Sequence, residues 1–421
     1  MGVTPGYKQT DTGVIPQDWR SESLDAIATV TSGKRIPLGR TLTEHETPHP
    51  YIRVTDMRRG TVCTDDLRYV PIEVFPAIKR YRIYKEDIFI SVAGTLGIVG
   101  KVPAILDGAN LTENANRITP KGCLQDYLLH VLMSPGIQGA IEAQRTVGAQ
   151  PKLALARIRK FDIPLPATSS EQGAIADALS DADSLIASLE QLLAKKHHIK
   201  RGVMQEFLTG RRRLPGYSSG WVRTNIASVL TRISTGLNPR QNFRLNEGGS
   251  CYYVTIRNFS NGHLRLDDDC DLIDEAAFGR INERSDLRKG DILFSSIGRI
   301  GDVYLVPETP KNWNINESVF TLRPNKNRVA PLFLFHALMS DQVRSELEKG
   351  ATGSTFTGVK QAHLKEIPIH MPSSLDEQLA VAEVLSHMDS EIDALKTKVE
   401  TARQLKQGMM QELLTGRIRL V

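Results

Sequence analysis

Several kinds of sequence feature are scarce or missing in this chain, and each absence excludes a class of protein. The 421 residues include only four cysteines, which stand far apart without a Cys-x-x-Cys pair: Cys63, Cys123, Cys251 and Cys270. We therefore expect neither a disulfide framework nor a structural zinc site, and we expect a reducing cytoplasm as the compartment. No run of about 18 apolar residues is present, and the N-terminus lacks the apolar core of a signal peptide. We therefore expect no membrane span.

Familiar catalytic and cofactor-binding motifs are also absent. The chain has no Gly-x-x-x-x-Gly-Lys-Ser/Thr phosphate loop, no Gly-x-Ser-x-Gly and no Asn/Asp-Pro-Pro-aromatic tetrad of amino-methyltransferases. Gly94, Gly97 and Gly100 are wrongly spaced for a dinucleotide loop. The adjacent His197 and His198 diverge by about 100° on a helix, which indicates a solvated face rather than a metal site. We therefore expect no catalytic residue, metal or cofactor in this chain.

The length and charge of the chain limit the number of domains and the kinds of partner that can be expected. A chain of 421 residues exceeds one ordinary hydrophobic core, so two or more domains are expected. The net charge is +5 and the isoelectric point is near 8.9. This balance suits a nucleic-acid partner, although charge alone is weak evidence for one.

A long internal repeat is the strongest positive signal. Residues 171–214 align with residues 377–420 at a constant offset of 206, and 21 of the 44 aligned pairs are identical. A repeat spaced by half the chain indicates a molecule with internal pseudo-two-fold symmetry. Both copies end in Leu-Thr-Gly-Arg, in which Gly210 and Gly416 are placed as helix C-caps. Prolines and serines mark the helix starts, where Ser169 or Ser170, and Ser373 or Ser374, are candidate N-caps.

Each copy of the repeat also carries an apolar heptad seam. Spacings of 4, 3, 4, 3 and 4 recur in both copies, which predicts two long helices of about 58 Å. Because the seams match, we expect the helices to pack on each other rather than each on its own domain, and we expect the seam to continue through Ile199 and Leu405. The predicted packing residues are Ile175, Leu179, Ile186, Leu189, Val381, Leu385, Ile392 and Leu395.

The segments before the helices correspond more faintly, and short apolar runs broken by Gly, Asn and Pro predict mostly strands there. One helix is expected near residues 127–144 and another near 332–348. The duplicated loops combine Gly, Ser or Thr with basic residues, which suits contact with DNA phosphates and bases. A solvated turn explains each loop taken singly, whereas recurrence in both halves favours a function. The candidate DNA-binding residues are Lys34, Arg35, Arg53, Thr95, Gln150, Lys152, Arg240, Arg257, Arg299, Thr355 and Lys360. Residues 211–213, three arginines, suit either DNA or compensation of the helix dipole.

The order of a β-rich domain, a proline-marked Glu-Gln entry, a heptad helix and a Leu-Thr-Gly-Arg exit, repeated twice, resembles the specificity (S) subunit of type I restriction-modification systems. Residues 7–19, YKQTDTGVIPQDW, are also typical of that family's N-terminus, although the second half has Gly216 to Trp221 as GYSSGW in the corresponding place. The resemblance implies an α+β fold with two target-recognition domains and two helices that form an antiparallel coiled coil. The implied boundaries are 1–165 and 215–370 for the domains, and 166–214 and 371–421 for the helices.

The resemblance also implies function and partners. Each domain is expected to read one half of a bipartite target in double-stranded DNA, while the helices set the spacing and dock two methyltransferase (M) subunits. Those subunits are expected to hold S-adenosylmethionine, and motor-nuclease (R) subunits then join. A non-DNA-binding scaffold, in which the coiled coil joins two protein-binding domains, is the main alternative.

Overall fold

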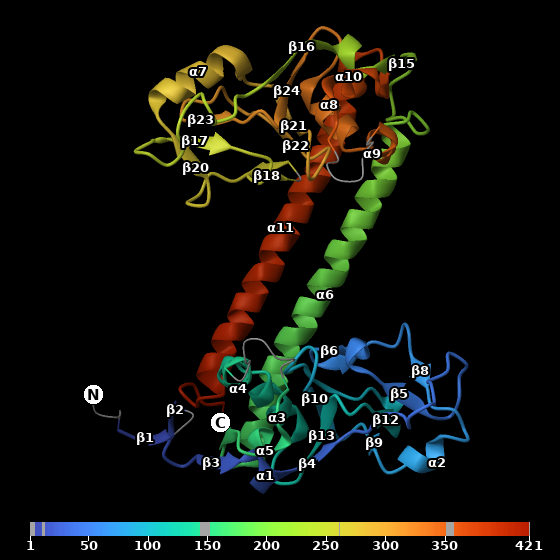
Figure 1. The fold of residues 1–421 in the computed structure, drawn as a ribbon, viewed down its shortest axis with the longest axis vertical. Helices are drawn as coiled ribbons and strands as arrows, with labels where there is room; N and C mark the ends of the chain where they lie inside the picture. Colours follow the sequence, from blue (N-terminus) through green and yellow to red (C-terminus); the bar gives the residue numbers. More distant parts are fainter. Residues whose placement is uncertain (1–4, 11–12, 144–151, 261, 351–357, 421) are drawn as a thin grey trace. The chain divides into compact units, whose positions relative to one another are not determined.

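The computed structural model describes residues 5–10, 13–143, 152–260, 262–350 and 358–420. The chain divides into two compact units, residues 1–190 with 398–421 and residues 191–397, here called unit 1 and unit 2. Two helices of 39 residues each, α6 (Ser169–Phe207) and α11 (Leu375–Leu413), contribute one part to each unit. Figure 1 shows the chain from blue at its start to red at its end.

Unit 1 combines short strands with short helices. Its elements are β1 (Tyr7–Thr10), β2 (Gly13–Pro16), β3 (Arg20–Ser23), α1 (Leu24–Ile27), β4 (Ala28–Ser32), β5 (Pro50–Ile52), η1 (Val54–Asp56), β6 (Met57–Arg58), β7 (Thr61–Val62), β8 (Arg68–Tyr69), α2 (Phe75–Ile78), β9 (Arg82–Ile83), β10 (Ile88–Ser91), β11 (Val99–Lys101), η2 (Ala104–Leu106), β12 (Ala109–Leu111), β13 (Ala115–Pro120), α3 (Gln125–Leu132), α4 (Pro135–Glu142), α5 (Leu155–Ile158) and β14 (Asp162–Leu165). One four-stranded sheet has the order β11-β10-β13-β4 and is antiparallel throughout. A second has the order β8-β5-β12-β9, with β5 and β12 parallel.

Unit 2 repeats this plan. Its elements are β15 (Trp221–Asn225), η3 (Ile226–Val229), β16 (Leu230–Thr235), β17 (Cys251–Val254), β18 (Phe259–Ser260), β19 (His263–Leu264), β20 (Asp271–Ile273), α7 (Glu275–Ser285), β21 (Ile292–Ser295), β22 (Val303–Leu305), β23 (Trp313–Ile315), β24 (Val319–Pro324), α8 (Pro331–Leu338), α9 (Asp341–Gly350), α10 (Gln361–Glu366) and β25 (Pro368–Pro372). The order β16-β24-β21-β22 is antiparallel, and in the order β20-β17-β23 the pair β17 and β23 is parallel. The expected α+β class with two β-rich domains is therefore confirmed.

A central strand in each unit has three consecutive apolar residues because it lies between two hydrophobic cores. Every residue of β10 is buried. Ile88 and Ile90 join one hydrophobic core, whereas Phe89 joins another. Alternate side chains of a strand point to opposite faces, so a strand between two cores needs apolar residues on both. In β21 the same division places Phe294 in one core and Leu293 in the other.

The single helix expected near residues 127–144 is two helices, α3 and α4, and the one near 332–348 is likewise α8 and α9. Pro135 begins α4, and the Ser134 hydroxyl accepts a hydrogen bond from the Ile137 amide at 3.5 Å. The Ser340 hydroxyl accepts from the Val343 amide at 3.3 Å in the same way. A proline or a capping serine starts a new helix at these positions, which the apolar periodicity alone does not reveal.

The long helices pack together, antiparallel, within each unit. In unit 1, Ile175 and Leu179 of α6 are fully buried in the core that also contains Met410 and Leu413 of α11. In unit 2 the roles are exchanged, because Val381 and Leu385 of α11 share a core with Leu208 after α6. Of the other predicted packing residues, Ile392 is buried, and the half-buried ones are Ile186, Leu189 and Leu395.

The predicted continuation of the seam is wrong at one position in each helix. Ile199 and Leu405 are exposed, and the lysine that follows each of them turns inward instead. Lys406 contacts Asp183 in unit 1, and Lys200 contacts Asp389 in unit 2. The aliphatic part of a lysine side chain packs against apolar neighbours while its ammonium reaches the carboxylate on the facing helix. A lysine can therefore fill an inward-facing position of the helix pair in place of an apolar residue.

Buried ion pairs close both ends of the helix pair, and we call these two contacts the clasps. After α6, the Arg213 guanidinium donates to both oxygens of Glu377, at 2.9 and 2.6 Å, and Glu377 is fully buried at the start of α11. After α11, Arg419 contacts Glu171 at the start of α6 in the same way. Bidentate pairing of this kind fixes orientation as well as charge. Arg213 therefore has a structural role at this end of the helix pair.

The glutamine that follows each clasp glutamate is also structural. The side-chain oxygen of Gln172 accepts a hydrogen bond from the Leu124 amide at 3.0 Å, and that of Gln378 accepts from the Ala330 amide at 2.8 Å. Leu124 and Ala330 are the N-caps of α3 and α8, so each glutamine satisfies a free amide at a helix start. The repeated Glu-Gln pair is thus explained by packing.

Helix termini agree with the sequence at three of four positions. Gly210 and Gly416 have φ of 72° and 67°, the left-handed conformation of a C-cap glycine. The Ser374 hydroxyl accepts from the Glu377 amide at 3.4 Å, as expected. At α6 the cap is Thr168, whose hydroxyl accepts from the Glu171 amide at 3.2 Å, and not Ser169 or Ser170.

Candidate nucleic-acid interface

The predicted loops of unit 1 lie next to one another, joined by main-chain hydrogen bonds. Gly33 crosses the end of β12 so closely that a Cβ there would lie 2.1 Å from the Thr112 carbonyl oxygen. The next two residues, Lys34 and Arg35, are exposed, and Arg35 donates to Glu113 at 2.8 Å. Only glycine permits this approach. The local fold therefore presents two cations at the edge of the sheet.

The turn after β10 joins the same region. The Val92 amide donates to the Asn114 carbonyl at 2.7 Å, and the Leu153 amide donates to the Val92 carbonyl at 2.9 Å. These bonds bring the exposed Thr95 and Lys152 beside the turn that carries Glu113. Three predicted loops thus form one surface, which we call the loop cluster of unit 1.

Unit 2 builds an equivalent loop cluster. Gly236 crosses β23, where a Cβ would lie 1.7 Å from the Ile315 carbonyl oxygen. The Ser296 amide donates to the Ser318 carbonyl at 3.1 Å, and the Val359 amide donates to the Ser296 carbonyl at 2.8 Å. Arg299 and Lys360 are exposed on these loops, and Arg240 is exposed on the loop that follows Gly236. The predicted residues Gln150 and Thr355 lie outside the described residues.

A buried tyrosine anchors each cluster. The Tyr51 hydroxyl donates to the Lys34 carbonyl at 2.8 Å, and the Tyr253 hydroxyl donates to the Leu237 carbonyl at 2.6 Å. Burial raises the pKa of Tyr51 to about 12 and raises the pKa of Tyr253 as well, so both hydroxyls stay protonated donors. The repeated tyrosine therefore holds the basic loop in place.

Several predicted cations already have partners within the chain. Arg53 contacts Asp56 through two nitrogens, at 3.0 and 2.6 Å, and also reaches Asp66. These contacts make Arg53 a support of its own loop. Arg299 donates to the Ile256 carbonyl at 2.9 Å and lies 3.2 Å from Asp302, while more than half of its side chain stays exposed. Arg257 is 76% exposed and lies 3.6 Å from Asp271.

Two basic clefts extend these surfaces, and the sequence reading missed most of their residues. A cleft of about 340 Å³ in unit 1 runs beside Gly33 and is lined by four arginines, Arg80, Arg82, Arg117 and Arg159. The guanidinium of Arg80 lies 4.9 Å from the Tyr81 ring. The alternation of basic and aromatic residues in 79–85, KRYRIYK, is the signal that could have found this cleft.

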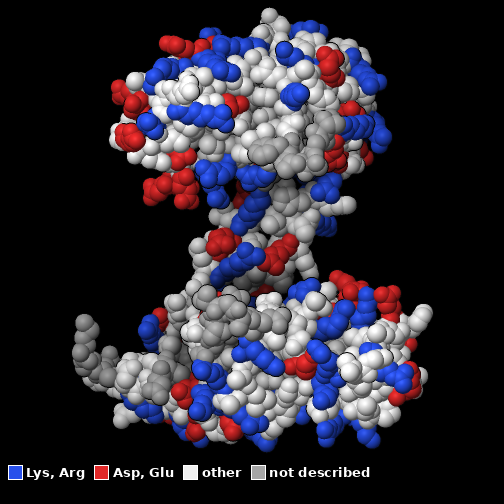
Figure 2. Space-filling view, in the orientation of Figure 1, with Lys and Arg blue, Asp and Glu red and all other residues white. Residues whose placement is uncertain are grey.

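The cleft of unit 2 lies elsewhere in its domain. It has a volume of about 460 Å³, and its cationic lining comes from Arg257, Arg265, Arg299 and Lys396. Figure 2 shows Lys and Arg side chains distributed over the face of each unit that is in view. The clusters are equivalent in position, but the clefts differ in place and in residues. The two units therefore present different arrangements of cations.

Among the described residues, no group of three or more His, Cys, Asp or Glu side chains is arranged to hold a metal ion. In the same part of the chain, no helix combines the length and apolar character needed to span a membrane.

Two β-rich domains with basic loop clusters, joined to one pair of long, similar helices, are the architecture of a class of DNA-recognising proteins. The chain matches the type I restriction modification DNA specificity domain twice, over residues 16–196 and 218–403, and it belongs to that family. Members of this family are the non-catalytic specificity subunits that recognise the DNA target within the restriction-modification complex.

Known relatives match over nearly the whole chain. A protein of Methanocaldococcus jannaschii, assigned as the MjaX specificity subunit of a type I restriction enzyme, is 25% identical over 98% of this chain and 97% of its own. The EcoBI specificity subunit of Escherichia coli is 23% identical over 96% of this chain and 86% of its own. The crystal structure of the type I system S subunit from M. genitalium has a TM-score of 0.59 at 17% identity, covering 97% and 98% of the two chains, and supports the fold.

Proposed function

We propose that each unit reads one half of a bipartite sequence in double-stranded DNA through its loop cluster and basic cleft. The observation that carries the proposal is the equivalent position of the two loop clusters combined with their unlike residues. Equivalent positions give both readers the same access to DNA, while unlike side chains allow unlike half-sites.

The residues proposed to contact DNA are those whose side chains are exposed on the clusters and clefts. In unit 1 they are Lys34, Arg35, Thr95, Lys152, Arg80 and Arg82, and in unit 2 they are Arg240, Arg257, Arg299 and Lys360. Gln150 and Thr355 keep the roles that the sequence suggests, and Arg53 is retained only as a support of its loop. The DNA substrate implies that the protein works in the cytoplasm.

The helix pair is proposed to set the distance between the half-sites. A helix of 39 residues has a length of about 58 Å, whereas B-DNA completes a turn in about 34 Å. The pair is long enough to leave base pairs unread between two major-groove contacts. It is also proposed to dock two methyltransferase subunits, which hold S-adenosylmethionine, and the motor-nuclease subunits join that assembly.

An exchange of one β-rich domain tests whether each unit recognises its own half-site independently. Residues 215–370 are replaced by the corresponding segment of a relative, and DNA methylated by the assembled complex is sequenced. One half-site is expected to change while the other half-site and the spacing stay the same. The matched control replaces residues 1–165 and is expected to change the opposite half-site. A change in both half-sites in either chimera contradicts independent reading.

A DNA-binding measurement distinguishes the proposed function from that of a non-DNA-binding scaffold. Wild-type protein assembled with its methyltransferase subunit is titrated with target and scrambled duplexes at two salt concentrations. The proposal predicts tighter binding of the target, with both affinities falling as salt rises. Equal affinity for both duplexes would favour a scaffold.

A further inference from the structure

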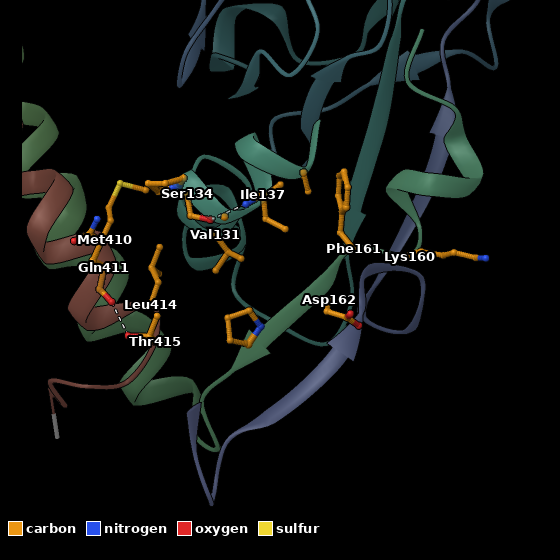
Figure 3. Close-up of a pocket in the computed structure, with 14 residues that line it drawn as sticks. Val131, Ser134, Ile137, Lys160, Phe161, Asp162, Met410, Gln411, Leu414 and Thr415 are labelled. Atoms are coloured by element: carbon orange, nitrogen blue, oxygen red, sulfur yellow. Dashed lines mark hydrogen bonds between the residues drawn. The ribbon is translucent and has the colours of Figure 1, made fainter. Parts of the chain in front are cut away.

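Unit 1 contains one mainly apolar hollow and one basic cleft. The hollow has a volume of about 420 Å³, lies among α3, α4 and α11, and is lined in part by the apolar side chains of Val131, Ile137 and Met410 (Figure 3). The basic cleft is lined by arginines and bordered by Gly33 and Leu111. A polyanion is attracted to the cleft and not to the apolar hollow. We therefore expect the residues that select a DNA sequence in unit 1 to lie around the cleft.

A glutamate stands among the cations beside this cleft. Glu113 follows Leu111 by two residues, in the turn after β12, and Arg35 follows Gly33 by two residues. The Nε of Arg35 donates to one carboxylate oxygen of Glu113 at 2.8 Å. A carboxylate repels phosphate, so a surface that contacted only the DNA backbone would bind more tightly without it. The glutamate therefore needs a role other than phosphate binding.

The fold does not require the side chain of Glu113. Other groups hold its turn, because the Ala115 amide donates to the Thr112 carbonyl at 3.2 Å and the Asn114 amide donates to the Thr112 hydroxyl at 3.4 Å. Apart from Arg35, the hydrogen-bond partner of the carboxylate among the described residues is the hydroxyl of the adjacent Thr112, at 3.2 Å. The glutamate therefore acts on Arg35 rather than on the turn.

The pairing leaves the outer edge of the Arg35 guanidinium available to a ligand. The bond to Glu113 uses Nε, and among the described residues no acceptor engages the two terminal nitrogens. The side chain of Arg35 is 72% exposed. Two neighbouring N–H donors of an arginine match the O6 and N7 acceptors of guanine in the major groove. Arg35 therefore presents a pair of donors of the kind that reads guanine.

The main chain next to Arg35 is fixed within the protein. The Lys34 amide donates to the Leu111 carbonyl at 2.8 Å, and the Tyr51 hydroxyl donates to the Lys34 carbonyl at 2.8 Å. A fixed main chain and a fixed carboxylate reduce the freedom that the guanidinium loses on binding. The Lys34 ammonium lies 5.9 Å from the Tyr81 ring and forms no ion pair with a described carboxylate. The two adjacent cations therefore suit different contacts, Lys34 a phosphate and Arg35 a base.

Unit 2 differs at this place. The residue two positions after Gly236, which corresponds to Arg35, is Asn238. An ion pair with Glu317, which occupies the turn position of Glu113, therefore cannot form there. The pair is a difference between the units, as expected of residues that select only one half-site.

We propose that Arg35 reads a guanine in the half-site of unit 1 and that Glu113 is the positioning residue that holds the guanidinium for this contact. The proposal rests on the proposed function. Because the carboxylate offsets the charge of Arg35, the pair adds little to the binding of any sequence and acts through discrimination between sequences. Loss of the carboxylate frees Arg35 to reach a phosphate.

Binding measurements test the proposal with the full chain assembled with its methyltransferase subunit. Glu113→Ala is titrated with target and scrambled duplexes at several salt concentrations. The affinity for the target should fall and that for the scrambled duplex should rise, with a slope against salt that is steeper by about one phosphate contact. The ratio of the two affinities should fall about five- to hundredfold, since a bidentate base contact contributes discrimination of that size. Arg35→Ala should lose the same discrimination without the gain for the scrambled duplex.

A modified base identifies the atom that is read. The base 7-deazaguanine, which lacks the N7 acceptor, is placed in turn at each guanine of the half-site that changes when residues 1–165 are exchanged. It should weaken binding of the wild type at one of these positions and leave Arg35→Ala unaffected there. Glu44→Ala is the matched control, because it removes a carboxylate from another ion pair of unit 1, 2.9 Å from Arg68 and outside the loop cluster. This control should keep the wild-type discrimination.

Three results would overturn the proposal. One is a unit 1 half-site without a G·C pair, and another is a Glu113→Ala protein that keeps the wild-type discrimination. The third is an equal loss of affinity for both duplexes, because a merely structural role weakens binding of any sequence. A wild type that binds target and scrambled duplexes equally refutes the proposed function instead.

Discussion

Replacing Arg213 by methionine probes the clasp that closes unit 2. The substitution keeps most of the side-chain volume but leaves the Glu377 carboxylate fully buried, with no cation in place of Arg213 and with the Ser219 hydroxyl, 2.5 Å away, as a neutral donor. Removing one partner of a buried ion pair costs about 3–5 kcal/mol, because the other charge stays buried without compensation. Unit 2 has 397 − 191 + 1 = 207 residues, for which 1 kcal/mol corresponds to about 2–4 °C. We therefore expect the unfolding transition of unit 2 to fall by roughly 10 °C.

Differential scanning calorimetry with two further variants measures this effect. Arg212→Met removes an exposed contact of 3.4 Å with Glu206 and is expected to change the free energy of unfolding by less than about 1 kcal/mol. Arg213→Met/Glu377→Gln removes both charges and is expected to recover much of the loss. An Arg213→Met protein as stable as Arg212→Met would refute the clasp as a stabilising contact.

The clasp also predicts a dependence on pH. Burial raises the pKa of Glu377, but the hydrogen bonds from Arg213 and Ser219 outweigh it and hold that pKa below its ordinary value. The stabilisation is therefore fully present above the ordinary glutamate pKa of about 4.3, and it is lost as the pH falls through the lowered value. The double variant should lack this loss.

Three further predictions concern other parts of the molecule. Arg80→Ala and Arg82→Ala should each weaken binding to target and scrambled DNA alike, and each should reduce the slope of log affinity against log salt concentration by the contribution of about one phosphate contact. Arg20→Ala on β3 should do neither. An unchanged slope in the Arg80 and Arg82 variants would place the unit 1 cleft away from DNA. Gly33→Ala forces a Cβ to 2.1 Å from a carbonyl oxygen, so it should destabilise unit 1 by about 1–3 kcal/mol and weaken DNA binding. Gly220→Ala is the control, because a Cβ at Gly220 meets open space, and it should have neither effect. Equal urea midpoints for the two variants would disprove the close crossing. Burial lowers the pKa of His130 to about 4 and that of His336 to about 3, so the free energy of unfolding in urea should fall as the pH drops from about 6.5 toward those values. His130→Gln/His336→Gln should make this free energy less dependent on pH. An unaltered pH dependence would show that other groups titrate there.

The repeat and its periodicity predicted the architecture well because they reflect packing. The repeat at an offset of 206 residues predicted the helix pair, its glycine caps and most of its buried apolar residues. The pattern failed at Ile199 and Leu405, since apolar character alone cannot distinguish a residue that faces the partner helix from one that faces solvent. The inward lysines and the clasp arginines were missed for the same reason, because pairing of charges across 164 to 248 residues depends on the fold.

The candidate interface could be predicted only in part. Duplicated glycine loops identified Lys34, Arg35, Arg299 and Lys360, which the structure leaves exposed on the loop clusters. Arg53 lies in a similar sequence context, but its guanidinium contacts Asp56, three residues along the chain. The arginines at 117 and 159 join their cleft from β13 and from the residue after α5, so no local motif marks them.

The central claim is that the two units read DNA and the helix pair sets the distance between the sequences that they read. The most direct measurement deletes residues 190–196 and 393–399 together, which removes one heptad from each helix and leaves the contacts of Lys406 with Asp183 and of Lys200 with Asp389 in place. The deletion shortens each helix by about 10 Å, close to the length of three base pairs. Sequencing of DNA methylated by the assembled complex should return both half-sites unchanged with about three fewer unread base pairs between them. Altered half-sites with the original spacing would contradict the account.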